Sequence, residues 1–174
     1  MSTAAYSPRP AAVLADAIPG TWARDVALVI AGATLTVLGA QISIPIPPSP
    51  VPVTGQTLAV VLAGAALGSR RGGASQLLYV LLGLFLPVYS DGASGIDVIW
   101  GATGGYLVGF VIAAYVIGRF AEMGADRKPH LAFLAFCAGQ LIIFGIGVPW
   151  LKVATDQTWA WAIHNGFAIF IVGG

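Results

Sequence analysis

Charged residues are scarce in this sequence, and their scarcity indicates its class. Asp, Glu, Lys and Arg make up 9% of the 174 residues, and hydrophobic residues make up 57%. An ordinary soluble domain is about 25% charged. No charged residue occurs in five long stretches, which are 26–69, 72–90, 98–118, 131–151 and 157–174. Because a membrane-spanning helix needs about 20 mostly apolar residues, the sequence predicts an integral membrane protein.

Other features that the sequence lacks restrict which kind of membrane protein it can be. The stretches lack the alternation of apolar and polar residues that is typical of a transmembrane barrel, so we interpret them as helices. The net charge is +1 and no basic cluster is present, which argues against binding nucleic acid. The single cysteine, Cys137, excludes an intrachain disulfide. We therefore expect an all-α integral membrane protein embedded in the lipid bilayer.

Motifs for catalysis and for ion coupling are also missing. The chain has no GxxxxGK[ST] loop, so we do not expect it to hydrolyse ATP by that route. His130 and His164 fall on opposite predicted faces, which excludes a two-histidine metal site. The polar residues Gln76 and Gln140 within the spans are neutral, whereas ion-coupled carriers usually place ionisable groups there. We expect no catalytic residue, no metal and no cofactor in this chain.

The apolar stretches predict a bundle of six transmembrane helices, the last of them incomplete. We interpret residues 1–23 as a cytoplasmic N-terminal tail and 24–174 as one transmembrane domain. The expected spans are about 24–44, 53–69, 72–89, 103–120, 130–152 and the start of a sixth near 167–174. Because so short a final stretch cannot cross a bilayer, we expect the chain to be truncated within its sixth span.

The connections between spans carry their own signals. Residues 43–52, SIPIPPSPVP, hold five prolines, which predicts an extended and stiff connection. We predict a tight basic turn at 70–73 (RRGG) and an end to the fifth span near Pro149. The tryptophans of 152–165 are typical of a membrane interface.

Basic residues predict the orientation. One side of the predicted topology holds Arg9, Arg24, Arg70, Arg71, Arg119, Arg127 and Lys128, and the other side holds Lys152. The positive-inside rule then places the N-terminus in the cytoplasm. On this topology the proline-rich connection, residues 86–110 and the tryptophan-rich segment meet on the outer face, where a solute from outside would be bound.

Residues 86–110, LPVYSDGASGIDVIWGATGGYLVGF, form the best candidate for a site. Glycines let backbone amides approach a ligand closely, and the first turn of the following helix offers unpaired N–H groups. A plain connecting loop is the alternative interpretation. Ser94, Asp97 and His164 also fall on the outer side, which leaves an interfacial hydrolase as another class. A stand-alone facilitator or carrier of a small solute is a further alternative.

Residues 51–88, VPVTGQTLAVVLAGAALGSRRGGASQLLYVLLGLFLPV, and 101–110, GATGGYLVGF, resemble the BioY family. The resemblance covers roughly 28–174. Members of this family are the biotin-binding S components of energy-coupling factor (ECF) vitamin transporters in the cell membrane. The resemblance implies six transmembrane helices and an outer biotin pocket roofed by the loops after the first and third helices. It also implies energy from partners, namely a transmembrane coupling subunit and a pair of ATPases.

The resemblance suggests which groups meet biotin. By residue type and position, Gln56, Asp91, Ser94 and Asn165 are expected at its ureido end, with Asp91 the best acceptor. Tyr106 and Trp150 are expected to pack on the bicycle. The carboxylate is expected to bind Lys152 or the amides of Thr103, Gly104 and Gly105. Each residue also has a structural alternative, as a solvated loop residue, an interfacial aromatic or part of the core.

Ala23, Ala27 and Ala31 recur at every fourth position and therefore share one helix face. Small residues at this spacing let membrane helices approach closely, so internal packing is one interpretation. The first helix of the family carries an Ala-xxx-Ala face for the coupling subunit, so the resemblance implies docking as the other interpretation.

Two positions depart from the family pattern. Some members have an arginine directly after the tyrosine of GGY, where this chain has Leu107. Members also tend to carry Gly-Asp and then a lysine at the start of the sixth helix, where this chain has Gly173 and Gly174. These departures leave the partner of the biotin carboxylate open.

Overall fold

The computed structural model describes residues 13–17 and 22–170, and the described part is mostly helical. It begins with the 3-10 helix η1 (Leu14–Ala17), α1 (Trp22–Gln41), the two short strands β1 (Ser43–Ile44) and β2 (Val53–Thr54), α2 (Gln56–Leu67) and α3 (Ser69–Gly83). It continues with η2 (Ser90–Gly92), α4 (Ile96–Trp100), α5 (Gly104–Glu122), η3 (Ala125–Arg127), α6 (Pro129–Thr155), α7 (Trp159–Ile163) and the π-helical turn η4 (His164–Ala168).

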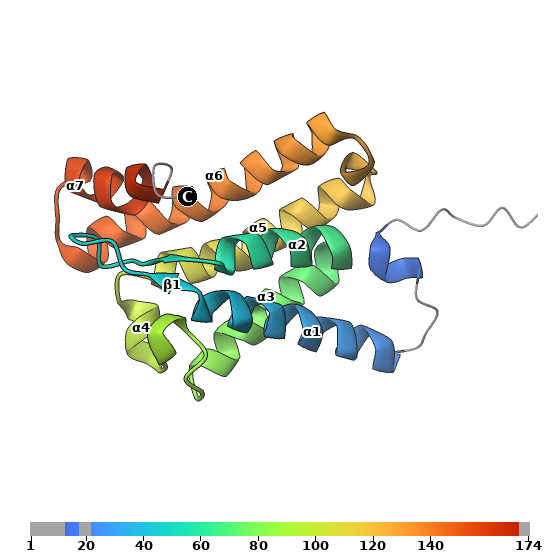
Figure 1. The fold of residues 1–174 in the computed structure, drawn as a ribbon, viewed down its shortest axis with the longest axis horizontal. Helices are drawn as coiled ribbons and strands as arrows, with labels where there is room; N and C mark the ends of the chain where they lie inside the picture. The colour runs from blue at the N-terminus through green and yellow to red at the C-terminus, as the bar shows by residue number, and fades with distance from the viewer. Residues whose placement is uncertain (1–12, 18–21, 171–174) are drawn as a thin grey trace, which may run out of the picture.

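Helix α5 is the centre of the bundle. It packs against α2, α3 and α6, while α1 packs against α2 and α3 on the other side (Figure 1). Ala113 and Ala114 on α5 are fully buried. A Cβ on Gly109 would lie 2.9 Å from the Ile143 Cα of α6, so this glycine lets the two backbones approach closely.

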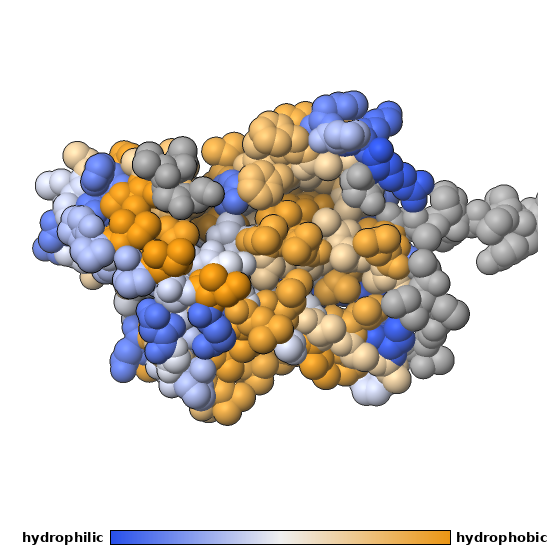
Figure 2. All heavy atoms as spheres, in the orientation of Figure 1, coloured by the Kyte–Doolittle hydropathy of each residue, from blue (hydrophilic) through white to orange (hydrophobic). Residues whose placement is uncertain are grey.

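Apolar side chains cover the outside of the bundle. Among the residues described, α1, α5 and α6 are long and apolar enough to cross a membrane, and α2 is a shorter apolar helix. Leu38 is 60% exposed and Leu141 is 68% exposed. Figure 2 shows a broad apolar band over the middle of the molecule, with hydrophilic residues gathered at its two ends. This distribution is that of a multi-pass membrane protein, because lipid replaces water around the band.

The proline-rich connection is extended, as predicted. Strands β1 and β2 pair antiparallel with Ser43 opposite Thr54 and Ile44 opposite Val53. The intervening loop therefore returns to the start of α2 beside the end of α1. The second helix accordingly begins at Gln56, after the strand, and not at residue 53.

The predicted turn at 70–73 is wrong. Helix α3 begins at Ser69 and runs through these residues, and the break from α2 lies at Gly68, which has φ +84°. Glycine adopts this left-handed conformation without steric cost. The Glu122 carboxylate of α5 accepts hydrogen bonds from the Ser69 N–H and Oγ at 2.8 Å each, so it caps α3 from another helix. Helix α3 ends at Gly83, several residues before the expected end of the third span at 89.

The fifth span does not end near Pro149, because α6 continues through it to Thr155. Proline costs a helix the hydrogen bond to the residue four positions earlier, which here is Gly145. Membrane helices tolerate such a proline where local adjustment satisfies the freed backbone.

The last helical segment begins earlier than expected. Thr158 precedes α7, and its side chain accepts a hydrogen bond from the Trp161 N–H at 3.3 Å. Helical structure then runs through η4 to Phe170, so it begins eight positions before the expected start near 167. Residues 171–174, the rest of the expected sixth span, lie outside the described residues, as does most of the expected N-terminal tail.

Candidate ligand-binding site

Three connections gather at one end of the bundle, where Figure 1 shows β1, α4 and α7 together on the left. Ser49, in the loop between the strands, donates a hydrogen bond from Oγ to the Asn165 carbonyl at 2.8 Å. The Gly95 N–H, just before α4, bonds to the Gly83 carbonyl at 2.8 Å. The first contact joins the loop between the strands to η4, and the second joins the connection before α4 to the end of α3. We call these three connections the roof.

A small cavity of about 40 Å³ lies beneath this roof, between α2, α5 and α6. Its lining is mixed apolar and polar and consists of Val51, Pro52, Thr54, Gln56, Thr57, Tyr89, Ser90, Val98, Thr103, Tyr106, Leu107, Phe110, Ile143, Phe144 and Phe170. Three of the predicted site residues, Gln56, Thr103 and Tyr106, therefore share one cavity. Leu107, which departs from the family pattern, also lines it.

Gln56 is held in place by a chain of hydrogen bonds. Its Nε2 donates to the Tyr79 hydroxyl at 2.6 Å, and its Oε1 accepts from Thr54 Oγ1 at 2.8 Å. An amide side chain has two donor hydrogens and two acceptor lone pairs. Gln56 therefore keeps one donor and one acceptor for a ligand, although it is only 7% exposed.

Tyr89, which lies in the connection after α3, supports the hydrogen bonds that hold Gln56. Its ring meets that of Tyr79 edge-on with centroids 5.6 Å apart, and its hydroxyl donates to the Val80 carbonyl at 2.7 Å. Burial raises the pKa of the Tyr89 hydroxyl. Sequence reasoning did not predict Tyr79 or Tyr89 as site residues, because their proximity depends on the fold of the 84–95 connection.

Tyr106 links the cavity to the last helical segment. Its hydroxyl donates to the Gly166 carbonyl at 2.9 Å, and its ring lies near those of Phe144 and Phe170. Thr103 Oγ1 donates to the Val98 carbonyl at 3.3 Å, which joins α4 to the start of α5. Both residues therefore combine a place in the cavity wall with a structural bond.

Gly104, Gly105 and Trp150 do not line the cavity. A Cβ on Gly104 would overlap the Ile99 carbonyl oxygen, and one on Gly105 would overlap the Trp150 Cβ. The Gly104 N–H already bonds to the Gly101 carbonyl at 3.3 Å. Trp150 donates from Nε1 to the same carbonyl at 3.0 Å and stacks on Trp100. The observed contacts of these residues are those of helix packing.

Asn165 is buried beside the roof with an unused acceptor. It is 2% exposed, and its Nδ2 donates to the Trp161 carbonyl at 3.0 Å. Among the described residues, its Oδ1 has no hydrogen-bond partner, and Asn165 is not one of the residues that line the cavity. An unpaired buried acceptor is costly, so a ligand N–H at this position would be stabilised. The residue lies in the π-helical turn η4, and such turns are frequent at functional sites.

Asp91, Ser94 and Lys152 lie outside the cavity wall. Asp91 and Ser94 are exposed, and Asp91 has a left-handed backbone with φ 58°. Lys152 is half-buried on α6. Among the described residues, no hydrogen bond joins Ser94, Asp97 and His164, all of which are exposed, and no group of acids, histidines and cysteine gathers in the manner of a metal site.

A larger groove of about 600 Å³ adjoins the cavity on the side between α2 and α6. The two spaces share Thr54, Thr57, Phe144 and Phe170 in their walls. Phe144 and Phe170 lie with ring centroids 5.6 Å apart. These two rings therefore lie at the boundary between the cavity and the groove.

The alanine face of α1 points away from the bundle. Ala23, Ala27 and Ala31 are all exposed, whereas Gly32, Ala33 and Thr36 on the opposite face are buried. Internal packing of this chain therefore does not use the three alanines, and the face is open to a partner helix or to lipid.

Known proteins resemble this chain along most of its length. The family model described as BioY family matches residues 8–174. Biotin transporter BioY of Thermotoga maritima is 43% identical over 138 residues, which are 79% of each chain. Biotin transporter BioY2 of Lactococcus lactis subsp. cremoris is 38% identical over 148 residues, covering 83% of this chain and 78% of the relative.

One solved structure shares the fold. It is the S-component for biotin from an ECF-type ABC transporter, and it matches with a TM-score of 0.76 at 22% identity. The match covers 89% of this chain and 86% of the other. The resemblance noted in residues 51–88 and 101–110 is thus confirmed by the family model and by relatives across most of the chain. This chain belongs to the BioY family.

Proposed function

We propose that this chain is the substrate-binding membrane subunit of an ECF-type importer and that it binds biotin at the extracytoplasmic side. The observation that carries the proposal is the roofed cavity, in which Gln56, Thr103 and Tyr106 meet apolar side chains. Biotin combines a ureido group with an apolar bicycle, and such a lining matches both. The relatives in Thermotoga maritima and Lactococcus lactis are biotin transporters, which supports the same substrate.

The ureido group needs acceptors for two N–H groups and a donor for its carbonyl. Within the described part of the chain, Asn165 Oδ1 is a buried acceptor without a partner, and Gln56 keeps one donor and one acceptor. We assign the ureido group to these two side chains and the bicycle to Tyr106 and its aromatic neighbours. Asp91, Ser94, Trp150 and Lys152 then act at the roof or at the tail of biotin, after a movement of the connections.

Binding requires the cavity to widen. Pockets for small molecules usually measure about 300–1,000 Å³, whereas the cavity measures about 40 Å³. Phe144 and Phe170 separate it from the groove of about 600 Å³. Rotation of the two rings would give the ligand the combined space of the cavity and the groove. Helix α6 and η4 would then close around the ligand.

Energy comes from partner subunits in this proposal. The chain itself carries no catalytic residue and no cofactor, and a pair of ATPases hydrolyses ATP elsewhere in the complex. The coupling subunit docks on Ala23, Ala27 and Ala31, which are exposed at the start of α1. We place the N-terminus in the cytoplasm, because the starts of α1, α3 and α6 and the end of α5 lie away from the roof (Figure 1). These ends and η3 carry the basic residues Arg24, Arg70, Arg71, Arg119, Arg127 and Lys128. The bundle contains six transmembrane helices, with the sixth starting in α7.

Titration calorimetry on the detergent-purified chain tests the substrate. We expect saturable binding of biotin with a Kd well below micromolar, weaker binding of desthiobiotin, and no binding of riboflavin. Gln56→Leu should weaken biotin binding at least about fivefold, because a net hydrogen bond contributes about 1 kcal/mol and the variant loses at least one. Gln41→Leu, at an exposed position on α1, is the matched control and should bind like the parent.

Binding of riboflavin in place of biotin by a folded sample would show that the substrate is wrong. Equal affinity of the Gln56→Leu and Gln41→Leu variants would remove Gln56 from the site. Thermal unfolding of each variant in the same detergent separates loss of binding from loss of structure.

A further inference from the structure

A second groove runs between α3 and α5 on the lipid-facing side of the bundle. It has a volume of about 430 Å³ and is lined by Arg70, Gly73, Ala74, Leu77, Val111, Ile112 and Tyr115. None of these residues lines the cavity beneath the roof. The groove is therefore separate from the proposed biotin site.

The groove is apolar along its length and basic at one end. Leu77, Ile112 and Tyr115 are 50%, 42% and 48% exposed, so they present their side chains to the surroundings of the bundle. A Cβ on Gly73 would lie 3.5 Å from the Tyr115 Cβ, which is an ordinary contact distance, so the α3 backbone lies directly beside the side chain of Tyr115. Arg70 stands at the start of α3, at the charged end of the molecule.

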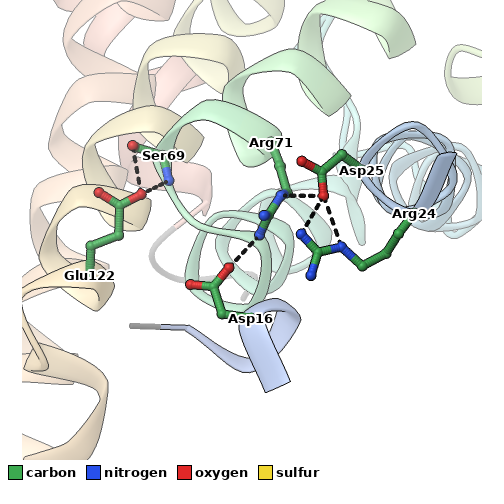
Figure 3. A network of polar contacts seen from close by, with 6 residues as sticks. All are labelled: Asp16, Arg24, Asp25, Ser69, Arg71 and Glu122. Carbon is green, nitrogen blue, oxygen red and sulfur yellow. Dashed lines mark hydrogen bonds and ion pairs between the residues drawn. The ribbon is translucent and has the colours of Figure 1, made fainter. Parts of the chain in front are cut away.

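Arg70 differs from its neighbour Arg71 in its contacts. Arg71 bonds to Asp16 and Asp25 at 2.8 and 3.2 Å (Figure 3). Within residues 13–17 and 22–170, no carboxylate forms an ion pair with Arg70, and its side chain is exposed. The charge of Arg70 is thus available to an anion from outside the chain.

We propose that this groove binds one anionic phospholipid. An acyl chain lies along Leu77, Val111 and Ile112, and the phosphate pairs with Arg70. The position of the groove on a membrane-facing surface selects a lipid, since an acyl chain matches its aliphatic walls. The unpaired guanidinium selects a negative headgroup, because basic residues at the end of a transmembrane helix attract anionic lipids.

Native mass spectrometry of the full chain in detergent tests the proposal. The probes are dioleoyl phosphatidylglycerol and dioleoyl phosphatidylcholine, which have the same acyl chains and differ in net charge. We expect the first lipid bound to be phosphatidylglycerol, with about a fivefold preference, the factor that one basic side chain supplies at an anionic surface. Glycerol 3-phosphate should not compete, because it lacks the acyl chains.

Two variants separate the headgroup from the chain. Arg70→Gln should abolish the preference and leave phosphatidylcholine binding unchanged. Ala74→Trp should fill the groove and weaken both lipids. Lys128→Gln is the matched control, since Lys128 is an exposed basic residue outside the groove, and it should behave like the parent.

The proposal is overturned if the parent binds the two lipids equally, or if Arg70→Gln keeps the preference. Competition by glycerol 3-phosphate would show a free phosphate site instead of a lipid site. If Arg70→Gln lost a copurifying coupling subunit while lipid binding stayed unchanged, the groove would be a protein interface. Because Arg70 is exposed, this variant keeps the test valid even if Ala74→Trp fails to fold.

Discussion

At the scale of single residues, glycines at the start of α5 decide how closely the roof packs. Gly105 faces Trp150 on α6, which itself stacks on Trp100 of α4 with ring centroids 5.8 Å apart. The two glycines of the GGY motif therefore hold three helices together at the site. The role of their amides at a carboxylate stays a prediction, and the contacts observed around the two glycines are packing contacts.

We predict that Gly105→Ala destabilises the protein by about 1–3 kcal/mol. The new methyl group would overlap the Trp150 Cβ, and overpacking of a close contact costs about that much. SDS-induced unfolding followed by tryptophan fluorescence measures the change. Gly145→Ala on α6 is the matched control, because no heavy atom lies within 4 Å of its added Cβ. Equal stability of the two variants would contradict the packing role.

At the scale of elements, the break between α2 and α3 depends on a residue from α5. Gly68 makes the break, and Glu122 caps the helix that follows it (Figure 3). Arg119 also bonds to Glu122, at 2.9 Å, from the exposed side. The start of α3 is thus fixed by an acid 53 positions further along the chain.

We predict that Glu122→Ala lowers the free energy of unfolding by about 1–2 kcal/mol. The variant removes the acceptor for the Ser69 N–H and Oγ, and a lost helix cap costs about that much. Arg119→Ala should cost under about 1 kcal/mol, because its side chain is 56% exposed and surface ion pairs contribute little. Unfolding titrations of both variants measure which one loses more free energy of unfolding. An equal or larger loss for Arg119→Ala would refute the capping role of Glu122.

The short helix η1 is held across the same end of the bundle. Val13 and Ala15 are each 4% exposed and pack with Ala63, Leu67 and Ala121. Asp16 bonds to Arg71 at 2.8 Å, and Arg71 also reaches Asp25 on α1. One arginine therefore joins η1, α3 and α1.

We predict that Arg71→Gln increases hydrogen exchange in residues 13–17 severalfold. The variant removes the ion pairs with Asp16 and Asp25, so only the buried side chains of Val13 and Ala15 would still hold residues 13–17. Salt at about 0.5 M should raise exchange in the parent as well, because the charges of Arg71, Asp16 and Asp25 are partly exposed and therefore screened. Arg70→Gln is the matched control, since Arg70 lies outside the network. Unchanged exchange in Arg71→Gln would show that burial of Val13 and Ala15 alone holds η1.

At the scale of the whole molecule, the two ends of the bundle have different chemistry. One end gathers the roof and the cavity, and the other gathers most of the described basic residues and the ion pairs of Figure 3. The alanine face of α1 begins at this second end and faces outward. Ligand binding and partner docking are therefore assigned to different surfaces.

We predict that Ala27→Trp reduces biotin uptake at least tenfold in cells that contain the coupling subunit and ATPases. The indole would block close approach of a partner helix, while biotin binding by the purified variant should stay unchanged. Leu134→Trp on α6 is the control, because Leu134 is an exposed position away from α1. Full uptake by Ala27→Trp would reject docking on this face, and uptake by the parent without partner subunits would favour a stand-alone carrier.

The sequence by itself determined the class of the protein. Charge-free stretches predict membrane helices because transfer into lipid depends on local composition, and the prolines of 43–52 predict a non-helical connection because they lack a donor. The motifs in 51–88 and 101–110 identify the family. Each of these properties depends on residues that are close together in the sequence, so the sequence alone is enough to predict it.

Only the tertiary structure decided which groups meet. The run at 70–73 is helical because Glu122, distant in sequence, caps Ser69, and Gln56 reaches the cavity because Tyr79 and Thr54 hold its amide. Tyr106 lines the same cavity, whereas Asp91 is exposed. Contacts between side chains many residues apart depend on how helices pack, and local composition does not encode that packing. The physical reason is that hydrophobic burial places a segment in the membrane without choosing its neighbours.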